Sequence, residues 1–117
     1  PRWQLHEVPL DLSECLQNLN HSDNCILIDC LTLWLSNCLH EKCWPQQQQL
    51  FLQQIQESQA DLFLVSNEVG SGIVPLGKLS REFVDHSGWL HQQLAESFDE
   101  VKLVVAGQAL TLKGKSA

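Results

Sequence analysis

The sequence predicts an α/β fold in which a mainly parallel sheet is flanked by helices. Three short runs are rich in aliphatic and β-branched residues, as expected of strands buried on both faces: 25–30 (CILIDC), 61–67 (DLFLVSN) and 101–107 (VKLVVAG). The segments between these runs carry apolar residues at helical spacing. Strands that alternate with helices call for a parallel sheet joined by right-handed crossovers.

The N-terminal part begins with a predicted strand and a predicted helix. Residues 3–12 (WQLHEVPLDL) alternate loosely, which indicates a short strand that Pro9 ends. Residues 12–19 then repeat apolar side chains at helical spacing. After the first buried run, residues 31–41 follow the helical period again, and one apolar face would consist of Leu31, Trp34, Leu35, Cys38 and Leu39.

The second half predicts two more helices and an edge strand. Residues 45–49, Pro45 and a glutamine run, indicate a polar break, either a solvated linker or a helix start, and residues 50–59 follow as a helix. A longer amphipathic helix begins near Pro75, and its apolar stripe consists of Leu76, Leu79, Phe83, Leu90 and Leu94. Residues 109–114 (ALTLKG) alternate like an antiparallel edge strand.

The composition excludes several classes of protein. The 117 residues are read as one domain, 1–117, and with 44% hydrophobic residues they can form a packed core. Seven basic residues are scattered among 14 acidic ones, and the net charge of −7 offers no basic face to a nucleic acid. No apolar run approaches the roughly 18–20 residues that a membrane span needs.

The cysteines point to a reducing compartment. There are five, an odd number with no C-x-x-C pair, which favours the cytoplasm over a disulfide-bonded secreted protein. Cys38, His40 and Cys43 are close enough in sequence to suggest zinc. Because a fourth ligand at the usual spacing is absent, we interpret them as ordinary residues at a helix end.

Asp29 is the first candidate for chemistry. It ends an apolar strand run, where a carboxylate can hold Mg²⁺ beside the phosphates of a nucleotide. It can equally cap the helix that follows, and the residue alone leaves both interpretations open. Thr32 lies about one helical turn after Asp29 and could act as an outer-shell partner of such a metal site. A buried hydroxyl bonded to the backbone is the simpler interpretation.

Asn67 and Glu68 follow the second predicted strand. In a parallel sheet they share its C-terminal edge with Asp29, and this edge is where α/β folds hold ligands. Glu68 is the candidate catalytic residue, because it can orient or deprotonate a substrate hydroxyl or help to hold the water shell of a metal. The alternative is a carboxylate that only braces its loop. Gly70 and Gly72 suit a turn that a ligand approaches closely.

Neither a phosphate-binding loop nor a histidine with a nucleophile signature occurs among these residues. No G-x-x-x-x-G-K-[ST] loop is present, although such a loop cradles the nucleotide in enzymes of this architecture. The histidines are not flanked by any nucleophile signature, and we interpret each as an ordinary surface or helix residue: His6, His21, His40, His86 and His91.

Three strings resemble the bifunctional adenosylcobinamide kinase / adenosylcobinamide-phosphate guanylyltransferase family: ILIDCLTLWLSNCL, FLVSNEVGSGIVP and VKLVVAGQALTLK. With the helix between them they cover most of the chain. The resemblance implies a P-loop NTPase-like (RecA-like) fold and a cytoplasmic homo-oligomer. It also implies phosphorylation of adenosylcobinamide with ATP or GTP, Mg²⁺ as cofactor, and transfer of GMP from GTP through a guanylyl-histidine to give adenosylcobinamide-GDP.

The resemblance also suggests roles for individual residues. Glu7 matches the acidic residue that follows the family's R-P…W segment and binds GTP, and Asp29 matches the acidic residue that contacts the nucleotide or its metal. The SNEVG string at 66–70 matches as well. There, Asn67 is expected to bind nucleotide, and the catalytic role of Glu68 is our inference from its position.

This chain departs from the family pattern at its start. The family begins with a glycine-rich G-x-R-S-G-K-S loop and places its nucleophilic histidine just before an R-P…W segment. Residues 1–3 look like the remnant of that segment, with a spacing one residue shorter than usual. We therefore expect the C-terminal two-thirds of such an enzyme, truncated at its N-terminus and inactive alone. Two rival hypotheses are another P-loop or RecA-like ATPase that shares only the strand-end carboxylate, and a non-catalytic truncated copy that binds an intact homologue.

Overall fold

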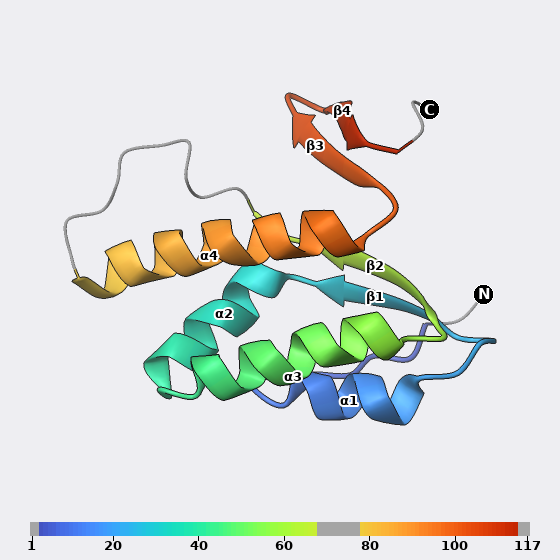
Figure 1. Ribbon diagram of the computed structural model, residues 1–117, viewed down its shortest axis with the longest axis horizontal. Coiled ribbons are helices and arrows are strands. Elements are labelled where there is room, and N and C mark those ends of the chain that lie inside the picture. The colour runs from blue at the N-terminus through green and yellow to red at the C-terminus, as the bar shows by residue number, and fades with distance from the viewer. Residues whose placement is uncertain (1–2, 68–77, 115–117) are drawn as a thin grey trace.

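The computed structural model describes residues 3–67 and 78–114, which form a mixed α/β structure (Figure 1). The elements follow in the order α1 (Leu12–Leu19), β1 (Cys25–Asp29), α2 (Leu31–His40), α3 (Trp44–Glu57), β2 (Asp61–Val65), α4 (Lys78–Ser97), β3 (Val101–Val105) and β4 (Gln108–Lys113). No helix of the described residues combines the length and apolar character that crossing a bilayer requires.

The strands β1 and β2 form a parallel pair. Their register runs from Cys25 opposite Asp61 to Asp29 opposite Val65. The helices α2 and α3 make the crossover that two parallel neighbours need. The first two predicted strands and their parallel pairing are therefore confirmed.

Only one face of this pair is covered within the described residues. The side chains that pack against the helical core alternate along both strands: Ile26, Ile28, Leu62 and Leu64. Between Asp61 and Asp29 on the opposite side lie Cys25, Leu27, Phe63 and Val65, which we call the open face. Leu27 is 49% exposed and Phe63 is 57% exposed. The prediction that these strands are buried on both faces is wrong, because the described helices contribute their core residues on the side of Ile28.

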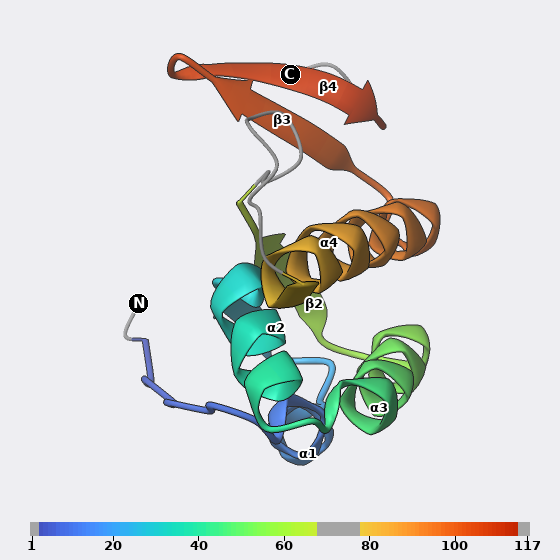
Figure 2. The same cartoon turned by 90° about the vertical axis from the view of Figure 1, so that its left-hand side faces the viewer.

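Trp34 of α2 lies at the centre of the core. Its ring centroid is 5.1 Å from that of Trp44 and 4.8 Å from that of Phe51, both on α3. Figure 2 shows α2 beside α4, and α1 near α3. The core residues are Leu12, Leu16, Ile28, Leu31, Trp34, Leu35, Cys38, Trp44, Phe51, Leu90 and Leu94. The predicted apolar faces of residues 31–41 and of the described part of the last helix are confirmed; Pro75 lies outside the described residues.

The third apolar run does not join the parallel pair. β3 pairs antiparallel with β4 in a separate two-stranded sheet, and Val104 is 66% exposed. A tight turn joins the strands, with φ of 51° at Ala106 and 74° at Gly107, as a type I′ turn requires. The prediction of a third buried, parallel strand at 101–107 is wrong, because in the described residues β3 pairs with β4 alone and its Val104 and Val105 stay exposed. The predicted antiparallel strand at 109–114 is confirmed.

The structure decides between the two interpretations of the glutamine run and corrects one further prediction. The glutamines up to Gln49 lie inside α3, which begins at Trp44 with Pro45 in its first turn, so they form a helix start and not a linker. Residues 3–8 have no regular structure, so the predicted N-terminal strand is wrong. The chain after it is held by side chains of α2, because Asn37 Nδ2 donates to the carbonyl of Pro9 (3.2 Å) and Trp34 Nε1 to that of Leu10 (2.9 Å).

Candidate functional site

Asp29 is exposed at the C-terminal end of β1. The next residue, Cys30, is the N-cap of α2, and no side chain forms a capping hydrogen bond there. The alternative interpretation of Asp29 as a helix cap therefore has no support. Because Asp29 is paired with Val65, its carboxylate stands beside the point where β2 ends. We call this edge of the sheet, from Asp29 to Asn67, the rim.

Asn67 meets the start of α2 at the rim. Its Nδ2 lies 3.5 Å from Thr32 Oγ1, and the same hydroxyl lies 2.8 Å from Cys30 Sγ. Thr32 is buried, but among the described residues its hydroxyl bonds to side chains and not to the backbone, contrary to the simpler expectation for this residue. The hydroxyl thus links the segment that follows Asp29 to the segment that follows β2.

A histidine that sequence reasoning passed over also reaches the rim. His91 of α4 places its Nε2 2.6 Å from Ser66 Oγ, and both residues are partly buried. No local motif marks His91. The signal available in the sequence was its place four residues after Ser87 and three before Leu94, both of which are buried. His91 therefore borders the apolar stripe of α4, and the interpretation of this histidine as an ordinary helix residue is incomplete.

The remaining predicted site residues are not brought to the rim by the described structure. Glu7 is exposed in the irregular segment 3–8 and forms no ion pair within residues 3–67 and 78–114. Glu68, Gly70 and Gly72 lie outside the described residues. Of the four predicted site residues, Asp29 and Asn67 are thus the two that the structure places on one edge of the sheet.

Neither the described pocket along α2 nor the cysteines near its end belong to the rim. A pocket of about 360 Å³ lies along the C-terminal half of α2, between Leu10 and Phe83, and is lined by neither Asp29 nor Asn67. In the part of the chain that the structure describes, no group of three His, Cys, Asp or Glu side chains could hold a metal ion. Cys38, one of the three residues that suggested zinc in the sequence, is buried in the core. Burial, followed by the neighbouring Cys43 and Asp11, raises the pKa of its thiol to about 12.

Comparison with known proteins identifies a family. The cobinamide kinase / cobinamide phosphate guanyltransferase family profile matches residues 1–112. The bifunctional adenosylcobalamin biosynthesis protein CobP of Pseudomonas aeruginosa is 42% identical over 116 residues, which cover 97% of this chain and 67% of that relative. The bifunctional adenosylcobalamin biosynthesis proteins CobU of Salmonella typhimurium and of Escherichia coli are 35% and 34% identical, and the matches cover 59% and 67% of their lengths. The chain thus spans about three-fifths to two-thirds of these relatives.

Proposed function

Because this chain belongs to the cobinamide kinase / cobinamide phosphate guanyltransferase family, we propose that it forms part of a bifunctional enzyme of cobalamin biosynthesis. That enzyme would phosphorylate adenosylcobinamide with ATP or GTP and then transfer GMP from GTP to the product. The observation that supports a nucleotide site is the rim, where Asp29 and Asn67 end neighbouring parallel strands. Ligands of open α/β sheets bind outside the carboxyl ends of the strands.

Each rim residue would have a distinct task. The amide of Asn67, held at Thr32, would orient the phosphates or the ribose of the nucleotide. Glu68 would orient or deprotonate the attacking hydroxyl, and Glu7 would contact GTP. We include a P-loop-like fold and a cytoplasmic location in the same proposal. The five free cysteines agree with the proposed location, because disulfides are rare in the cytosol.

The donor set at the rim fits Mg²⁺. This ion is usually bound by one or two carboxylates together with substrate phosphates and water, rather than by a cage of protein ligands. Asp29 would supply that carboxylate, and its exposure leaves it accessible to such a complex. When bound, the ion would neutralise charge that develops on the transferred phosphoryl group.

Asp29→Asn in the protein expressed from its complete reading frame tests the proposal. We expect kcat/KM for phosphorylation of adenosylcobinamide, followed with labelled ATP and GTP, to fall by about 100-fold, the usual scale for removal of one charge-stabilising group. The matched control is Asp61→Asn, which alters an exposed aspartate at the opposite end of β2 and should change kcat/KM less than twofold. Equal activity of the two variants would contradict the assignment of Asp29.

We further propose that the 117 residues do not turn over by themselves, because no phosphate loop with its lysine occurs among them. Incubation of this chain with labelled GTP should give no stable, acid-labile guanylylation. A labelled chain would contradict this proposal, because it would show that one of its own histidine or lysine side chains accepts GMP.

A further inference from the structure

The segment that follows β2 has few partners in the described structure. The ladder between the two parallel strands ends with the pair Asp29 and Val65, so residues 66 and 67 have no strand beside them. Two side-chain contacts hold them to described residues: Ser66 to His91 at 2.6 Å, and Asn67 to Thr32 at 3.5 Å. The second distance is at the weak limit for a hydrogen bond, whereas the first is short. Among the described residues, the shorter contact of this segment is therefore the one to His91.

The backbone that carries His91 is itself well held. Leu90 and Leu94 on the same helix are 1% and 7% exposed and belong to the core. A side chain with two torsion angles on such a helix reaches a defined point, and Ser66 Oγ lies there. The link thus runs from the rigid interior of α4 to the first residue after β2.

We propose that His91 is a positioning residue of the nucleotide site. Through Ser66 it fixes the end of β2, so that the Asn67 amide stays at Thr32 and faces the ligand beside Asp29. The part that concerns nucleotide rests on the proposed function. The physical coupling between His91 and Asn67 does not rest on it, and the two parts can be tested separately.

The coupling is tested by NMR on the isotopically labelled protein expressed from its complete reading frame. We expect His91→Ala and Ser66→Ala to shift the side-chain amide signals of Asn67 and the backbone amide signal of Thr32, and to speed exchange of both with solvent. His91→Gln, whose amide can reach the same hydroxyl, should restore them. His86→Ala is the matched control, because His86 lies on the same helix but packs edge-on to Trp44 and Trp89. Unchanged Asn67 signals in both His91→Ala and Ser66→Ala would overturn the proposal.

The functional part is tested by kinetics in the protein from the complete reading frame. His91→Ala and Ser66→Ala should each raise KM for the nucleotide about tenfold, and the double variant should be no worse than either, because both remove the same link. His91→Gln should recover most of the loss, and His86→Ala should leave KM unchanged even if it lowers the melting temperature. An unchanged KM, or additive losses, would overturn the positioning role. If the unaltered protein phosphorylates no cobinamide, the proposed function fails, and the NMR result alone decides whether His91 positions Asn67.

Discussion

Cys38 shows at the level of one residue how burial changes chemistry. Its side chain is fully buried on α2. Burial first, then the nearby Cys43 thiol and the Asp11 carboxylate, raises its pKa from 9.0 to about 12. Thiolates are the form that binds zinc and attacks electrophiles. The neutral thiol therefore agrees with the interpretation of Cys38 as a small hydrophobic residue in the core.

The shifted pKa predicts how stability depends on pH. The folded state holds the Cys38 proton more tightly than the unfolded state, so this contribution is complete below pH 9 and is lost as the pH rises through about 12. Between these values, the melting temperature of the protein expressed from its complete reading frame should fall more steeply with pH than that of its Cys38→Ala variant. Cys25→Ala, which changes an exposed thiol, is the control and should follow the unaltered slope. Parallel curves for all three would contradict the assigned pKa.

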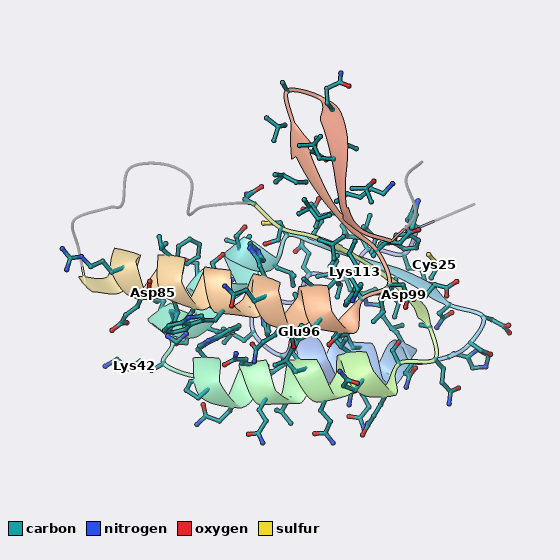
Figure 3. All side chains as sticks on the ribbon, turned by 45° about the horizontal axis from the view of Figure 1, so that its top comes forward. Cys25, Lys42, Asp85, Glu96, Asp99 and Lys113 are labelled. Carbon is teal, nitrogen blue, oxygen red and sulfur yellow. The ribbon has the colours of Figure 1, made fainter. Side chains whose placement is uncertain are left out.

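At the level of elements, one lysine of the β3–β4 hairpin bonds to the end of α4. Lys113 Nζ donates to the carbonyls of Ala95 (2.8 Å) and Glu96 (3.0 Å), two of the last carbonyls of the helix. Figure 3 shows Lys113 and Glu96 at this end of α4. A cation there satisfies free carbonyls and interacts favourably with the helix dipole.

Lys113→Ala should therefore loosen the hairpin and destabilise the end of α4. The expected loss is about 1 kcal/mol in the free energy of unfolding, measured with urea. Hydrogen exchange of the β3 and β4 amides should speed up more than that of α1. Lys102→Ala is the control, because Lys102 is exposed on the same hairpin and forms no ion pair with a described residue. Equal effects of the two substitutions would argue against the role of Lys113 at the carbonyls that end α4.

The type of an element, helix or strand, could be predicted from the sequence better than the element that it packs or pairs with. The helical period of residues 31–40 and the apolar runs of β1 and β2 act locally, so their type was predictable, as was the shared rim of Asp29 and Asn67. The partner of β3 depends on a turn at Ala106 and on what else borders the sheet, which an apolar run does not encode. The contact of His91 with Ser66 joins residues 25 apart through the packing of α4, so no motif could reveal it.

At the level of the whole molecule, apolar surface remains uncovered within the described residues. The hairpin stands away from the helical layer in Figure 2, and the radius of gyration is 14.7 Å, against about 13 Å for a compact chain near this length. On the hairpin, Val104 and Leu112 are 66% and 63% exposed. The parallel pair adds its open face, and in the described residues each of its strands has only the other as a partner. Exposed faces and unpaired strand edges favour association with another chain.

We therefore predict that the 117-residue chain is oligomeric or aggregates at micromolar concentration, and that the open face contributes to association. Complete burial of a phenylalanine or leucine side chain gains about 1.5–3 kcal/mol, so a few such residues can hold a complex together. Phe63→Lys should shift the mass found by light scattering after size exclusion toward the monomer, because a charge on this face would have to be buried. Leu33→Lys is the matched control, since Leu33 is similarly exposed (64%, against 57% for Phe63) but is the one exposed large hydrophobic residue of α2. A monodisperse monomer with a sharp thermal transition in the unaltered chain would show that these faces need no partner.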